Sequence, residues 1–88
     1  MSEADLKKLR KKIDSIDGKI VHLLCKRFEA VDEVAKVKKN LGLDVNDRAR
    51  EREVIQNYKS AAKNLDEEFV EELARLILAQ SKKIQSRR

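Results

Sequence analysis

The chain has 88 residues, and its 21 Lys and Arg against 16 Asp and Glu give a net charge of +5. Charged residues make up 42% of the sequence and aromatic residues 3%, and it contains no Pro or Trp. This composition argues against a β-sandwich, which needs turn residues and β-branched or aromatic strands. It favours a single all-α domain over residues 1–88.

Several classes of partner are not expected. The basic residues are interleaved with acids and accompanied by no aromatic platform, so we expect no nucleic-acid binding. No apolar run reaches the roughly 18–20 residues of a membrane span, and the charged N-terminus lacks the apolar core of a signal peptide, so we expect no membrane insertion. A single Cys25 suits a cytoplasmic location. One Cys and one His cannot build a usual zinc site, so no metal is expected.

The first predicted element is one long helix from Ala4 to about Asn40, with apolar residues at helical spacing and Gly42 just past its end. About 36 residues at 1.5 Å each span roughly 54 Å. A compact domain of this size has a radius of gyration of only about 12 Å. Two shorter helices can cover only part of such an apolar stripe. We therefore expect a homodimer in which the long helices pack against each other.

Two cations interrupt the apolar stripe of this helix. Arg27 and Lys38 are eleven residues apart and fall within the apolar sector, which is roughly 100° wide, and Arg10 lies just outside its edge. Buried cations need an anion, because leaving them unpaired is costly. A carboxylate of the protein, a bound anionic ligand, or extension of the side chains to water would each satisfy this requirement.

The second predicted helix runs from a cap at Asn46 or Asp47 to about Lys63. Its apolar face takes in Glu51 and, at its edge, Arg50, so both are expected to turn inward. The other charged residues of this stretch are expected to face solvent: Arg48, Arg52 and Glu53.

The third predicted helix runs from about Asp66 to Ser86, with Asn64 or Asp66 as its cap. Neutral polar residues interrupt its broad apolar face: Gln80, Ser81 and Gln85. A pair between Glu51 and Lys38, and interface contacts for the glutamines, would explain these features without a ligand. Taken together, however, cations, an acid and neutral donors along an apolar core are what a small dianion needs.

Four segments carry a longer pattern: LRKKIDSIDGKIVHLLCKR at 9–27, VAKVKKNLG at 34–42, VNDRARERE at 45–53 and AQSKKIQ at 79–85. In this order and spacing the chain resembles the all-α (AroQ-type) chorismate mutases over nearly its full length. The resemblance implies an intertwined homodimeric helical bundle of three-helix chains with two active sites. It also implies the Claisen rearrangement of chorismate to prephenate in Phe and Tyr biosynthesis, without a cofactor.

The resemblance also implies roles for individual residues. Arg10, Arg27 and Arg50 would bind the two carboxylates of chorismate, with Arg10 donated to the partner's site and Arg27 also counted as catalytic. Ser81 would add a hydrogen bond to a carboxylate.

Two further pairs complete the predicted site. Lys38 and Gln85 would flank the ether oxygen whose bond breaks, and Glu51 and Asp47 would hold the ring hydroxyl. Two alternatives remain open: an isochorismate pyruvate lyase of the same fold, and a basic helical binding module. The binding module leaves Arg27 and Lys38 on the apolar stripe unexplained.

Overall fold

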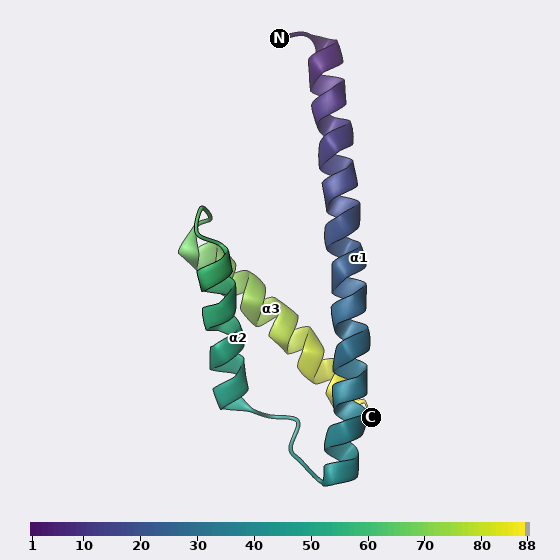
Figure 1. Ribbon diagram of the computed structural model, residues 1–88, viewed down its shortest axis with the longest axis vertical. Coiled ribbons are helices and arrows are strands. Elements are labelled where there is room, and N and C mark those ends of the chain that lie inside the picture. The colour runs from purple at the N-terminus through teal and green to yellow at the C-terminus, as the bar shows by residue number, and fades with distance from the viewer. Residues whose placement is uncertain (88) are drawn as a thin grey trace. The chain divides into compact units, whose positions relative to one another are not determined.

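The computed structural model describes residues 1–87, which form three α-helices and, within that range, no strand. They are α1 (Glu3–Leu41), α2 (Arg48–Ala61) and α3 (Glu67–Ser86) (Figure 1). The all-α, three-helix prediction is confirmed, and α1 extends the predicted Ala4–Asn40 by one residue at each end. None of the helices in the described range is long and apolar enough to cross a lipid bilayer.

A Schellman motif ends α1. Gly42 has φ +69°, a left-handed conformation that residues with a Cβ rarely adopt. Its N–H donates to the carbonyl of Lys39 at 3.2 Å, and the N–H of Leu43 donates to the carbonyl of Lys38 at 2.8 Å. The predicted stop at Gly42 is confirmed, and it places Lys38 in the last turn of the helix.

Side-chain caps begin α2 and α3. The Asp47 carboxylate accepts from the backbone N–H of Arg50 at 3.0 Å, and the Asp66 carboxylate accepts from that of Glu68 at 3.2 Å. Each bond satisfies a donor that the first turn of a helix leaves without a partner. The sequence offered two candidate caps for each helix, and the structure uses Asp47 rather than Asn46, and Asp66 rather than Asn64. The end of α2 at Ala61 falls two residues before the predicted Lys63.

The packing divides the chain into two units, residues 1–30 and the part from Val31 onward. The first unit is the N-terminal portion of α1, and its apolar stripe is exposed. Relative exposure is between 46% and 54% for its regularly spaced residues: Leu6, Leu9, Ile13, Ile16 and Ile20. The buried apolar residues of the described chain all lie in the second unit.

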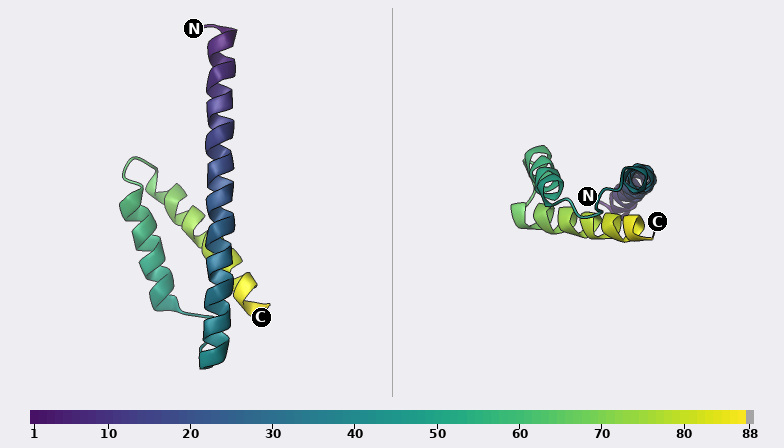
Figure 2. Two further views of the ribbon diagram at one scale, coloured as in Figure 1. Left: turned by 45° about the vertical axis from the view of Figure 1, so that its right-hand side comes forward. Right: turned by 90° about the horizontal axis from the view of Figure 1, so that it is seen from below.

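The second unit is built on α2 and α3, which run antiparallel and are joined by a short turn (Figures 1 and 2). Its core combines Val54 of α2 with Val70, Ala74 and Ile77 of α3, and Ala74 is fully buried at 0% exposure. The three α3 residues follow helical spacing and so form one stripe. This packing sets the register in which charged residues of α2 and α3 face each other.

Ion pairs join the two helices near the turn. Lys59 Nζ of α2 lies 3.3 Å from Glu71 Oε2 and 3.6 Å from Glu67 Oε1 of α3. Arg75, one turn after Glu71 on the same helix, donates to Glu71 Oε1 at 2.7 Å. The hydrogen bond from Arg75, followed by the contacts with Lys59, holds the pKa of the Glu71 carboxyl below its ordinary value of 4.5.

Acid is expected to remove the stabilisation that Glu71 provides. Because its pKa is lower in the folded than in the unfolded chain, this stabilisation is complete above the unfolded pKa and is lost as pH falls through the folded one. The thermal midpoint of the wild type should therefore exceed that of Glu71→Gln at neutral pH, with the difference shrinking in acid. Circular dichroism across a pH series measures this difference. The exposed neighbour Glu72 supplies the control, Glu72→Gln; a Glu71→Gln difference that does not change with pH would contradict the expectation.

Candidate active site

The side chains of Lys38 and Gln85 meet at the C-terminal ends of α1 and α3. Lys38 Nζ donates to Gln85 Oε1 at 3.0 Å and to the carbonyl oxygen of Val45 at 3.2 Å. Both Lys38 and Gln85 are half-buried. The sequence-based prediction places these two residues beside the same substrate atom, and the structure brings them together across 47 residues of sequence.

The hydrogen bonds leave donors for a ligand at this point. A lysine ammonium has three N–H groups, and two of those of Lys38 have acceptors among the described residues. Because the carbonyl end of the Gln85 amide accepts from Lys38, the NH₂ end is the part of Gln85 that is able to donate. The arrangement suits an electron-rich oxygen, and the catalytic role of the pair stays a prediction.

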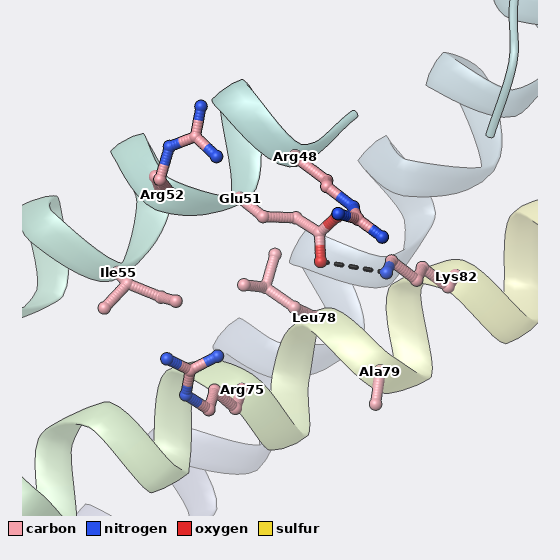
Figure 3. Close-up of a pocket in the computed structure, with 8 residues that line it drawn as sticks. All are labelled: Arg48, Glu51, Arg52, Ile55, Arg75, Leu78, Ala79 and Lys82. Atoms are coloured by element: carbon pink, nitrogen blue, oxygen red, sulfur yellow. Dashed lines mark ion pairs between the residues drawn. The ribbon is translucent and has the colours of Figure 1, made fainter. Parts of the chain in front are cut away.

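Glu51 lies in a groove of about 370 Å³ between α2 and α3 (Figure 3). Its Oε1 is 2.9 Å from Lys82 Nζ, whereas its Oε2 is buried and accepts no hydrogen bond from any described residue. A buried acceptor without a donor costs about 1–3 kcal/mol. A donor supplied by a ligand or by a second chain would remove that cost. The remaining lining residues of the groove are Arg48, Arg52, Ile55, Arg75, Leu78 and Ala79.

Arg50 differs from the inward orientation expected of it. Its guanidinium donates to Glu53 Oε1 at 2.7 Å, and its side chain is 61% exposed. Arg50 lies at the edge of the apolar face, where a long side chain can swing to an acid three residues further on. Arg48 and Arg52, expected to face solvent only, are exposed but line the groove with Glu51. Substrate binding by Arg50 stays a prediction.

Asp47 and Ser81 are each engaged within the chain. The Asp47 carboxylate is exposed and caps α2 through Oδ1. Ser81 is buried, and its hydroxyl donates to the carbonyl of Ile77 at 2.8 Å. A hydroxyl has a single proton, so Ser81 must rotate away from Ile77 before it can donate to a substrate carboxylate. The predicted substrate contacts of both residues stay predictions.

Arg10 and Arg27 both belong to the first unit, on one uninterrupted helix. Seventeen residues separate them, which corresponds to about 26 Å along the axis. Arg10 is exposed, and Arg27 is half-buried. One chain therefore cannot bring both guanidinium groups to the same small ligand through this helix.

The sequence-based prediction omits Lys82. The residue follows Ser81 directly and precedes Gln85 by three positions, so it adjoins the predicted polar face of α3. That neighbourhood was a signal for a role near the site. The pairing of Lys82 with Glu51 depends on how α2 and α3 are aligned. A helical wheel drawn for one helix gives no information on that alignment.

The described residues contain no group of three or more His, Cys, Asp or Glu side chains placed to hold a metal ion. Lys38 is instead hydrogen-bonded to Gln85, and Glu51 forms an ion pair with Lys82. The chain is thus an all-α protein. The pair of Lys38 and Gln85 at the ends of α1 and α3 makes a candidate site for a small organic anion.

Comparison with known proteins identifies the family. The family model for chorismate mutase type II matches residues 9–86. The chain is 33% identical to a chorismate mutase of Methanocaldococcus jannaschii over 82 residues. This match covers 91% of this chain and 83% of that protein. It is 34% identical over 80 residues to a T-protein of Enterobacter agglomerans, covering 89% of this chain but only 21% of the T-protein. The chain belongs to the chorismate mutase type II family, and it is an isomerase of this class.

A solved structure agrees with the fold. A conserved hypothetical protein from Pyrococcus furiosus is 40% identical, with a TM-score of 0.76 over 92% of this chain and 95% of that one. The resemblance noted from the sequence is therefore confirmed at the level of family and fold.

Proposed function

We propose that this chain converts chorismate to prephenate in a site that includes Lys38 and Gln85. The observation that carries the proposal is their hydrogen bond, 3.0 Å long, which places an ammonium and an amide side by side at the ends of α1 and α3. The family supplies the substrate. We expect the reaction to take place in the cytoplasm, within one domain spanning residues 1–88.

The rearrangement breaks the ether C–O bond and forms a C–C bond in one unimolecular step. No proton is transferred, so no nucleophile, metal or cofactor is required. Arg10, Arg27 and Arg50 hold the two carboxylates and keep the flexible substrate in its compact conformation, which removes conformational freedom before the reaction. This role of the arginines is the binding part of the proposal.

The second part of the proposed mechanism is electrostatic stabilisation of the transition state. Negative charge grows on the ether oxygen as the C–O bond lengthens, so donors directed at that atom stabilise the transition state more than the substrate. A free N–H of Lys38 and the NH₂ of Gln85 are the donors we assign to it. Glu51 accepts from the ring hydroxyl through Oε2, the buried oxygen for which the described chain provides no donor.

The active form is proposed to be a homodimer. Two features support it: the exposed apolar stripe of residues 1–30, and the separation of Arg10 from Arg27 along one helix. Burying that stripe against a second copy removes apolar surface from water. A partner running along it would also supply an Arg10 to the site of the first chain, whose own Arg10 lies about 26 Å from Arg27 along one helix.

The test is to incubate the purified chain with chorismate and follow the loss of its ultraviolet absorbance, with prephenate identified by chromatography. Isochorismate is supplied in a parallel reaction. Prephenate formation supports the proposal, and no loss of chorismate contradicts it. Salicylate and pyruvate from isochorismate, without prephenate from chorismate, would instead assign the chain to the lyases.

A further inference from the structure

We propose that Lys82 is a positioning residue for Glu51: it holds one carboxylate oxygen so that the other is presented to the ring hydroxyl of the substrate. The inference rests on the proposed function, because it gives Glu51 the task of accepting that hydroxyl. It concerns a residue that the sequence-based prediction of the site leaves out.

The geometry of the pair carries the argument. Lys82 Nζ of α3 lies 2.9 Å from Glu51 Oε1 of α2, and their side chains are 39% and 25% exposed. Figure 3 shows the two side chains meeting across the groove from opposite helices. A carboxylate is planar, so a contact that fixes Oε1 also fixes the direction in which Oε2 points. Oε2 is the buried oxygen with no donor among residues 1–87.

A general role in joining α2 to α3 does not explain this arrangement. Lys59 already bridges the same two helices through Glu71 at 3.3 Å and Glu67 at 3.6 Å, close to the turn. In that cluster both oxygens of Glu71 have partners, Oε2 with Lys59 and Oε1 with Arg75. The pair of Lys82 with Glu51 differs because one oxygen is held and the other is left unsatisfied.

The pair is also a weak candidate for a purely stabilising contact. A single ion pair with side chains 39% and 25% exposed contributes less to stability than the network of Lys59, Glu71 and Arg75, because solvent screens it and ordering two long side chains costs entropy. A directed acceptor, in contrast, needs to be held in one orientation before the substrate arrives. Lys82 can provide this without touching the substrate.

Lys82→Met is expected to raise the KM for chorismate about tenfold, the scale of one hydrogen bond to a charged acceptor, with kcat changed much less. The split is expected because the ring hydroxyl is bound similarly in the substrate and in the transition state. Lys82→Arg, which keeps a cationic donor, should restore most of the affinity. Thermal unfolding of each variant shows whether the fold is retained.

Two controls separate positioning from structure. Lys59→Met removes the other α2–α3 lysine bridge and should leave KM close to that of the wild type. In a Glu51→Ala background, Lys82→Met should add no further increase in KM, because the residue through which it acts is gone.

The outcomes are distinct. Equal rises in KM for Lys82→Met and Lys59→Met would overturn the inference, and so would a full Lys82→Met effect in the Glu51→Ala background. Both results would leave the proposed function standing, because the wild type would still convert chorismate. A wild-type chain that leaves chorismate intact would overturn the proposed function and this inference with it.

Discussion

Lys38→Ala is expected to lower kcat for chorismate by about 10²–10³-fold, the range seen when one preorganised donor to a developing oxyanion is removed. Lys38 Nζ is already held by Gln85 and Val45, so its remaining N–H has a fixed direction before substrate binds. The lost interaction is stronger in the transition state than in the ground state. The effect should therefore fall on kcat more than on KM.

Lys39→Ala is the matched control for this variant. Lys39 is the next residue in the same last turn of α1, is exposed, and has a side chain with no described hydrogen bond or ion pair. We expect it to retain nearly full activity. Circular dichroism and thermal unfolding check that both variants keep their helices, since Lys38 also bonds the loop at Val45. A folded Lys38→Ala variant with near-normal turnover would refute the assigned role.

Mixing two inactive variants is expected to restore activity if Arg10 acts in the partner's site. Arg10→Ala and Lys38→Ala should each be nearly inactive as homodimers. In a mixed dimer, the site with an intact Lys38 receives the intact Arg10 of the other chain. Random pairing makes half of the dimers mixed with one good site each, so about a quarter of wild-type activity should return.

A second mixture provides the control for this experiment. Arg27→Ala and Lys38→Ala are both proposed to remove groups that one chain supplies to its own site. Their mixed dimers contain no complete site and should stay inactive. The chains are unfolded together and refolded, and chorismate loss is measured before and after. Recovery in neither mixture, or equal recovery in both, would contradict the donation of Arg10 across a dimer.

Local sequence determined the three helices and the point at which the first one ends. The spacing of apolar residues predicted α1, and Gly42 marked its end because only a residue without a Cβ adopts a positive φ easily. Asp47 and Asp66 were both among the predicted caps, since a short carboxylate can reach the N–H groups of the following turn. These features depend on neighbours within a few residues, so the sequence alone contained enough information.

Part of the candidate site also followed from the sequence. Lys38 was singled out because it interrupts the apolar stripe of α1, and Gln85 was selected by the resemblance to a family. The structure brings the two within hydrogen-bond distance. Periodicity alone did not choose Gln85 over Gln80. The inward orientation expected of Arg50 was not found, because a flexible side chain at the edge of a face can turn to a nearby acid such as Glu53.

Only the tertiary structure decided how the charged residues of α2 and α3 pair. Lys82 meets Glu51, and Lys59 meets Glu71, because the core of Val54, Val70 and Ile77 sets one antiparallel alignment of the two helices. A helical wheel gives the direction in which each side chain leaves the axis of its helix. It does not show which residue of the other helix that side chain faces. The sequence by itself therefore determined the family and the three helices, and it limited the cap of each shorter helix to two candidates. The contact that leaves one oxygen of Glu51 without a donor emerged only when the two helices were packed together.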